Sequence, residues 1–208
     1  MTRILLADIP LEKEVKFGSF LAKVGSKSAP LNIISLGTIL QKEGHEIEFT
    51  FEDDSDNFIC SKLLTFRPAI VGVTCMTMSY KYLSRFIKII RSVLPDVHII
   101  VGGVHPSTFP EDTMKENPEL LAAFIGEADK NLPAFVSLLS NGPFDYNALN
   151  RIPNIIFRKP DGTLQITPRD SFIENLDELP FPNFNLIEKY FTRFYPAFSR
   201  HYLPWPTA

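Results

Sequence analysis

A compact, mostly β-branched run followed by a helical apolar pattern recurs between residues 3 and 139, and this repetition restricts the fold more than any other feature of the sequence. Strand-like runs alternate with helix-like segments, and short turn signals separate them. The expected strands cover residues 3–8, 45–51, 69–74, 97–102 and 121–125, and the expected helices cover residues 30–44, 55–66, 82–93, 110–116 and 131–139. Such alternation implies a parallel sheet with helices on both faces. The sequence therefore predicts a doubly wound, Rossmann-like or flavodoxin-like α/β domain with a five-stranded parallel sheet over residues 1–142.

The pattern changes after Gly142-Pro143. Two apolar runs, residues 152–158 and 163–167, flank the turn sequence Lys-Pro-Asp-Gly, which predicts a β-hairpin. The following LDELPFPNFNLI is rich in proline and phenylalanine and indicates an irregular linker. Residues 191–208 are crowded with aromatics and prolines, which favours a fragment whose next domain covers them over a disordered terminus. We therefore expect residues 143–208 to form a hairpin extension and a linker.

Composition narrows the class of protein. At 208 residues and 45% hydrophobic content, the chain can bury one core of ordinary size. The 21 basic and 24 acidic residues are dispersed, so we expect no nucleic-acid partner. No run approaches the ~20 apolar residues that span a bilayer. Cys60 and Cys75 are too far apart for a C-x-x-C pair and are consistent with a reducing compartment. We expect an unexported, cytoplasmic protein without a membrane span.

Ligands of doubly wound sheets bind outside the carboxyl ends of the strands. Asp8, Thr74, the Gly102-Gly103 pair and the Gly126-Glu127 pair each end a predicted strand, and the loop of residues 10–29 leaves the first strand at the same edge. The paired glycines allow the backbone to turn tightly beneath a ligand. These positions are expected to converge on one site.

Few polar residues of the sequence stand in a pattern typical of a catalytic or metal-binding site. The four histidines give no triad and no H-E-x-x-H spacing, and only His105 lies at a carboxyl tip. His105 can donate to a ligand or fix its own loop, and Glu127 can accept from a ligand or cap the next helix. Neither a phosphate loop nor G-x-G-x-x-G occurs, and the acidic residues 52–56 lack calcium-loop spacing. We predict no catalytic residues and no metal ligands.

Several segments, in order, resemble the N-terminal part of cobalamin-binding radical S-adenosylmethionine (SAM) proteins. The resemblance covers residues 29–190. Its landmarks are the glycine pair followed by His105-Pro106, a Gly-Glu-Ala-Asp block at residues 126–129 where the family usually shows G-E-G-E, and an L-D-x-L-P-x-P segment at residues 176–182. The matching stretches are APLNIISLGTILQKEGHEIEF, IVGVTCMTMSYKYLSRFIKIIRSVLPDVHIIVGGVHPSTFPEDTM, FIGEADKNLPAFVSLL, IPNIIFRKPDGTLQITPR and ENLDELPFPNF. The block at residues 126–129 keeps the charge pattern of the family but loses one glycine.

The resemblance implies a domain that holds cobalamin over the strand tips, followed by a barrel with an iron-sulfur cluster on a C-x-x-x-C-x-x-C loop. The chain lacks that motif, so the 4Fe-4S cluster and SAM are expected on a longer parent chain, and the fragment is expected to be inactive alone. The wider cobalamin group carries a D-x-H-x-x-G loop that this sequence lacks. The resemblance then implies that Leu11 to Ala29 cover the lower face of a five-coordinate or water-bound cobalt.

A corrinoid needs a broad, flat floor, which Gly102-Gly103 with the short side chains of Thr74 and Thr77 would supply. The expected cofactor contacts are Asp8, Thr74, Met76, Thr77, Gly102, Gly103, His105, Gly126 and Glu127.

We interpret the chain as the cobalamin-binding module of a radical SAM enzyme, with cobalamin and the C-terminal radical SAM barrel as its partners. A B12-dependent methyltransferase is the leading hypothesis. A radical SAM cyclase of the anaerobic magnesium-protoporphyrin ester type, or an oxidoreductase, is the alternative within the class. A cofactor-free α/β docking module is the alternative from another class, because the cobalt-ligating histidine motif is absent and the Gly-Glu block is altered.

Overall fold

The computed structural model describes residues 1–10, 29–140, 145–170 and 173–190. Its centre is a seven-stranded sheet with the order β2-β1-β3-β4-β5-β6-β7. The first five strands are parallel, as predicted, and β6 and β7 are antiparallel to their neighbours. The strands are β1 (Arg3–Asp8), β2 (Glu46–Thr50), β3 (Ile70–Thr74), β4 (His98–Gly102), β5 (Ala122–Phe124), β6 (Ile155–Arg158) and β7 (Leu164–Ile166). The predicted doubly wound α/β fold is confirmed.

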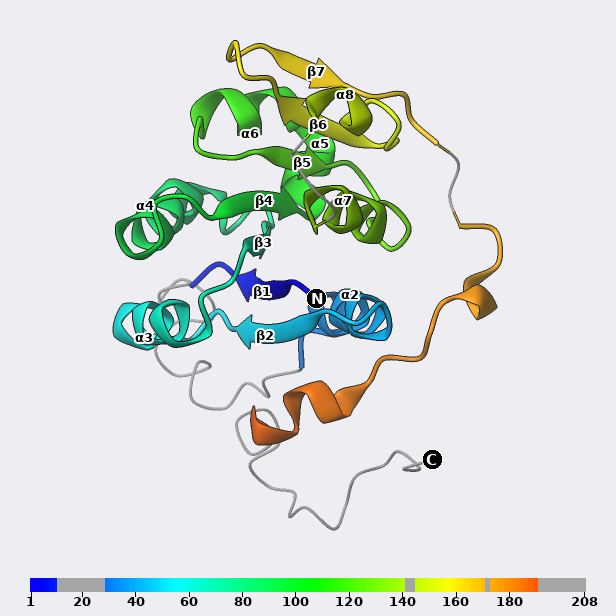
Figure 1. Cartoon of the computed structure of the whole chain (residues 1–208). Helices are drawn as coiled ribbons and strands as arrows, with labels where there is room; N and C mark the ends of the chain where they lie inside the picture. Colours follow the sequence, from blue (N-terminus) through cyan, green and yellow to red (C-terminus); the bar gives the residue numbers. More distant parts are fainter. Residues whose placement is uncertain (11–28, 141–144, 171–172, 191–208) are drawn as a thin grey trace.

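Helices cover both faces of the sheet. Figure 1 shows α2 and α7 on one face and α3 and α4 on the other. The helices are α2 (Leu31–Lys42), α3 (Asp56–Phe66), α4 (Leu83–Val93), α5 (Val104–Thr108), α6 (Pro110–Glu116), α7 (Asn131–Ser140) and α8 (Tyr146–Leu149). The described residues also form the 3₁₀ helices η1 (Tyr80–Tyr82), η2 (Leu176–Glu178) and η3 (Phe184–Tyr190). Among the described ranges, no helix combines the length and apolarity that a bilayer crossing requires.

The parallel strands are apolar on both sides, and this divides the buried residues into two cores. Ile4 and Leu6 of β1 face the core beneath α2 and α7, whereas Leu5 and Ala7 face the core beneath α3 and α4. This division follows from the alternation of side chains along a strand. The sheet is therefore buried on both faces, as the near-continuous apolar runs predict.

The predicted hairpin extends the same sheet. β6 pairs with β5, so that Ile155, Ile156 and Phe157 lie opposite Phe124, Ala123 and Ala122, and the three β6 side chains are fully buried. The hairpin is thus continuous with the sheet formed by residues 1–142. A functional division at residue 142 stays a prediction.

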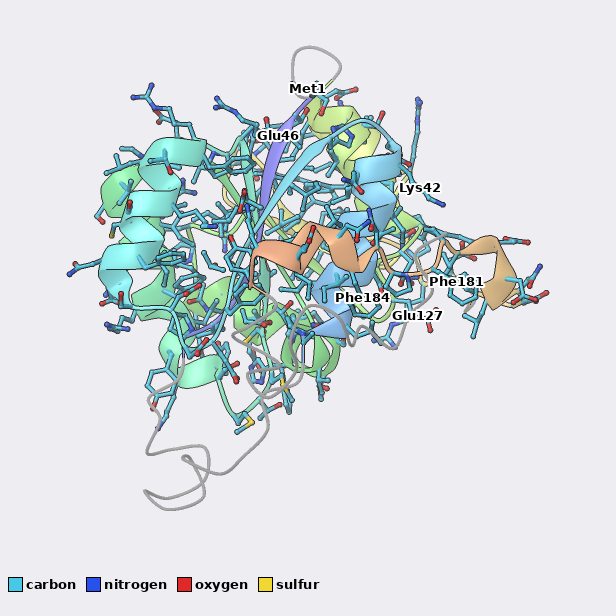
Figure 2. The ribbon with its side chains drawn as sticks, turned by 90° about the horizontal axis from the view of Figure 1, so that it is seen from below. Met1, Lys42, Glu46, Glu127, Phe181 and Phe184 are labelled. Atoms are coloured by element: carbon cyan, nitrogen blue, oxygen red, sulfur yellow. The ribbon has the colours of Figure 1, made fainter. Side chains whose placement is uncertain are left out.

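The stretch of residues 173–190, here called the returning segment, runs from the β7 edge of the sheet to the opposite edge beside β2 (Figure 1). The backbone N–H of Asn183 donates to Thr38 Oγ1 at 2.8 Å, and its side-chain Nδ2 donates to Gln41 Oε1 at 2.9 Å. Ile187 is 1% exposed and joins the core beneath α2. Figure 2 shows η3 with Phe184 passing across α2. The segment that was predicted to be an irregular linker therefore packs against α2 through Asn183 and Ile187.

Candidate functional site

A cavity of about 400 Å³ lies between the sheet, α2 and α7 near the carboxyl ends of the parallel strands. Leu6, Ile100 and Phe124 form its floor, and Leu36 and Leu132 contribute walls from the two helices. These side chains belong to, or pack against, the core beneath α2 and α7. The cavity therefore adjoins that core at the edge where doubly wound folds bind ligands.

The turn after β4 is built around Gly103. Its φ of 111° and ψ of −171° form a backbone conformation that glycine adopts readily and other residues do not. The backbone N–H of Cys75 donates to the Gly102 oxygen at 2.8 Å, and that of His105 donates to the Cys75 oxygen at 3.2 Å. The predicted tight glycine turn is present. The atoms pressed against Gly103 on its Cβ side are those of the Cys75 backbone.

Ser107 connects the ends of two strands. Its hydroxyl donates to the Gly103 oxygen at 2.7 Å and accepts from the backbone N–H of Gly126 at 2.9 Å. Gly126 has a φ of 79°, and no atom lies within 4 Å of an ideal Cβ at this position. The serine therefore holds the β5 tip against the β4 tip. Sequence reasoning missed it, although serine four residues after Gly103 has the spacing of a back-bond in the first turn of α5.

The structure brings together five of the nine residues expected at the site. Thr74, Gly102, Gly103, Gly126 and Glu127 line the cavity. Thr74 Oγ1 accepts from Asn32 Nδ2 at 3.4 Å, which brings the first turn of α2 to the tip of β3.

The other four expected residues lie outside the cavity lining. Asp8 is half-buried at the tip of β1 and is paired in register with Thr74. Met76 and Thr77 are exposed on the loop after β3. The fourth, His105, is buried on α5. Their assignment as cofactor contacts stays a prediction, and the loop expected to cover the cobalt falls largely on residues 11–28, outside the described part of the chain.

His105 is 7% exposed and stacks on Tyr80, with 3.7 Å between ring centroids. Its Nδ1 atom is buried without a hydrogen-bond partner among the described residues. Burial lowers the His105 pKa, and nearby Glu116 and Asp112 only partly oppose this. Tyr80 donates its hydroxyl proton to Glu116 at 2.5 Å. The ring stacking joins α5 to η1, whereas Nδ1 lacks the hydrogen bond expected of a loop-fixing histidine among the described residues, so both roles considered for His105 stay predictions.

Glu127 and Asp129 place two carboxylates at the cavity. Glu127 is exposed, and its Oε2 accepts from the backbone N–H of Ile173 at 3.4 Å, which reaches the returning segment. Burial raises the pKa of Asp129, and the charge of Glu127 raises it further. Sequence reasoning did not select Asp129, because its position in the Gly-Glu-Ala-Asp block did not reveal that it lines a cavity. In the described part of the chain, no three His, Cys, Asp or Glu side chains group as metal ligands.

The sequence profile of the B12 binding domain matches residues 19–136. The chain belongs to the B12-binding domain family. This B12-binding domain is 29% identical over 188 residues to an uncharacterised methyltransferase of Pyrococcus horikoshii, a match that covers 89% of the chain and 39% of the relative. It is 27% identical over 173 residues to the anaerobic magnesium-protoporphyrin IX monomethyl ester cyclase of Rubrivivax gelatinosus, which covers 80% of the chain and 30% of the cyclase.

Among solved structures, the B12-binding domain is similar to the cobalamin-dependent SAM radical enzyme OxsB with aqua-cobalamin and SAM bound. The TM-score is 0.69 at 19% identity, and the match covers 93% of this chain and 25% of OxsB. At this identity the likeness shows a shared fold. The resemblance to cobalamin-binding radical SAM proteins is confirmed, and the chain spans less than half the length of each relative described.

Proposed function

We propose that this domain binds cobalamin across the carboxyl ends of β1, β3, β4 and β5 and presents it to a radical SAM domain on a longer parent chain. One observation carries the proposal: the cavity between α2 and α7 opens an otherwise packed core at the strand tips. An apolar cavity of about 400 Å³ with a few polar groups in its lining is the kind of space in which small molecules and cofactors bind.

The residues present fit such a cofactor. The cavity is too small for a complete corrinoid, so it takes only a flat, apolar arm, and the macrocycle lies over the strand tips. Thr74, Gly102 and Gly103 provide a floor with short side chains or none, and Gly126 leaves open the space beside β5. Asn32 and Ser35, one turn apart on α2, offer polar groups to the arm. When bound, cobalamin supplies a cobalt that carries a transferable methyl group, and the domain binds and orients it.

The activity of the parent chain is proposed from the relatives. The match to a methyltransferase covers more of this chain than the match to the cyclase, which supports a cobalamin-dependent methyltransferase, with a cyclase as the second candidate. No C-x-x-x-C-x-x-C motif occurs in the sequence, so we propose that the fragment is inactive alone and works with a radical SAM barrel. Its cysteines are unpaired, which supports a reducing, cytoplasmic setting.

The experiment is retention of hydroxocobalamin through gel filtration, read from the visible spectrum of the protein fraction. The wild-type domain is expected to co-elute with corrin absorbance. Leu36→Trp fills the cavity and is expected to abolish retention, whereas Leu64→Trp, on exposed α3 surface of the opposite face, retains it. Circular dichroism checks that both variants are folded. A folded wild-type domain without corrin absorbance would overturn the proposal and favour a cofactor-free docking module.

A further inference from the structure

A second pocket of about 200 Å³ adjoins the cavity and shares Gly126 and Glu127 with it. It lies between the loop that enters α7 and the residues that follow β7, with Asn131 on one side and Arg169 on the other. A single ligand can therefore reach both spaces across the Gly126-Glu127 wall. The function proposed above does not use this pocket.

The pocket is lined by a polar side chain whose amide faces the pocket space. Asn131 is 9% exposed, lines the pocket, and makes no hydrogen bond with the described residues through its carboxamide. Its carboxamide atoms are not among the fully buried unpartnered atoms of the described residues, so they remain accessible from the pocket, where water or a ligand can bond them. The side chain of Asn131 has two donor hydrogens and an acceptor oxygen available for a ligand.

The charges around the pocket select the class of that ligand. Lys130 and Arg169 are balanced by Glu127 and Asp170, so the lining favours neither an anion nor a cation. Lys130 lies 3.7 Å from Glu178, and Asn154 Oδ1 accepts from the backbone N–H of Asp170 at 2.8 Å. The site therefore suits a neutral group that both donates and accepts.

We propose that this pocket holds one of the primary carboxamide arms at the edge of the corrinoid, paired amide to amide with Asn131. The inference rests on the proposed cobalamin binding and adds a second anchoring point to it. The Asn131 carboxamide can donate an N–H to the oxygen of the arm and accept an N–H from it. Gly126 and Glu127, which line both spaces, place the arm beside the cavity. Asn131 is then a residue that discriminates among corrinoids by their edge substituents.

The experiment compares two ligands, hydroxocobalamin and its monocarboxylic acids in which one propionamide is hydrolysed, by spectroscopic titration of the full chain. Wild-type protein is expected to bind the all-amide cofactor roughly tenfold more tightly than one of the acid isomers, because a carboxylate cannot donate to Asn131. Asn131→Leu is expected to weaken cobalamin binding roughly tenfold and to lose this preference. The matched control Asn147→Leu, at an exposed asparagine of α8, leaves both unchanged.

A ligand-free measurement accompanies the titration. If Asn131 serves a ligand and not the fold, Asn131→Leu does not lower the urea midpoint of the free domain, whereas a structural hydrogen bond would make it fall. Should the leucine variant fail to fold, Asn131→Ala provides the same comparison of ligands. Unchanged cobalamin affinity and unchanged preference in a folded variant would overturn this inference alone. Absence of cobalamin binding by the wild type would overturn the proposed function together with it.

Discussion

The carbonyl oxygen of Cys75 lies 2.7 Å from the position that a Cβ atom on residue 103 would occupy. The loop after β3 and the turn after β4 are therefore in backbone contact at Gly103, and any side chain there would separate them. Gly102, the preceding residue, differs sharply, because its Cβ would meet only Phe124 Cβ at an ordinary 3.8 Å.

Gly103→Ala is expected to lower the free energy of unfolding by about 1–3 kcal/mol, since it adds backbone strain and displaces the Cys75 turn. Urea denaturation measures the change. Gly102→Ala is the matched control and is expected to have a small effect, because its Cβ has room. Equal losses in the two variants would show that the close approach at Gly103 does not matter for stability.

His105 predicts a pH dependence. Its pKa in the folded domain is lowered by burial, so the unfolded chain binds the proton more readily below about pH 6.5. Stability from neutral His105 is therefore present above that pH and is lost as the pH falls through the folded pKa. His105→Phe keeps an aromatic ring against Tyr80, and we expect it to lose less stability between pH 7.5 and 5.5 than the wild type.

Thermal unfolding at the two pH values gives the comparison for His105. Burial also lowers the pKa values of His45 and His98, so part of the pH dependence remains in the variant. His105→Ala, which removes the stacked ring, is expected to be less stable than His105→Phe at both pH values. Identical pH profiles for the wild type and His105→Phe would contradict the prediction.

Glu48 connects β2 with the returning segment. Its Oε2 accepts from Lys62 at 2.8 Å and from the Tyr190 hydroxyl at 3.0 Å, and Lys189 pairs with Oε1. Burial alone would raise the Glu48 pKa, but the hydrogen bonds from Lys189 and Lys62 lower it overall. The network therefore stabilises the fold above the unfolded pKa of about 4.3 and is lost as the pH falls through the folded pKa.

Glu48→Gln is expected to cost about 1–2 kcal/mol at pH 7 and progressively less below about pH 4. Urea denaturation at pH 7 and pH 3.5 tests this. The control is Glu111→Gln, which breaks an exposed pair with Lys115 on one helix and is expected to change stability little. A Glu48 effect that persists undiminished at pH 3.5 would rule out the charged network as its source.

Cys75 is expected to resist alkylation in the folded domain. Its thiol is buried, and this raises its pKa to about 12 despite an opposing hydrogen bond with Ser79. The thiolate fraction at pH 8 is then on the order of 10⁻⁴. Mass spectrometry after iodoacetamide treatment should show modification of partly exposed Cys60 first and of Cys75 only in denaturant. Rapid native labelling of Cys75 would contradict its burial.

The parallel strands could be predicted because each β-branched run, such as Ile70 to Thr74, stops at a residue that breaks the pattern. The helix α5 was not predicted, although its Pro106 is compatible with a first helical turn. The hairpin was predicted without its partner strand β5, because strand pairing is a non-local property.

The site was only partly predictable for a related reason. Thr74 and Gly126 stand at strand ends, which the pattern identifies. Leu36 and Leu132 look like ordinary core residues in the sequence, and only the tertiary structure shows that they line a cavity. Asn131 was missed because an asparagine at a helix start is typical whether or not its side chain has a partner.

Thr38 and Asn183 are 145 residues apart in the chain, yet their hydrogen bond fixes the returning segment on α2. During synthesis on a ribosome, α2 emerges early, but Ile187, which seals its core, emerges among the last described residues. The apolar surface that Ile187 covers beside α2 therefore stays open to water until nearly the whole domain has left the exit tunnel. A nascent chain that ends before the returning segment cannot yet complete this core, so the final packing of α2 follows translation of residues 173–190.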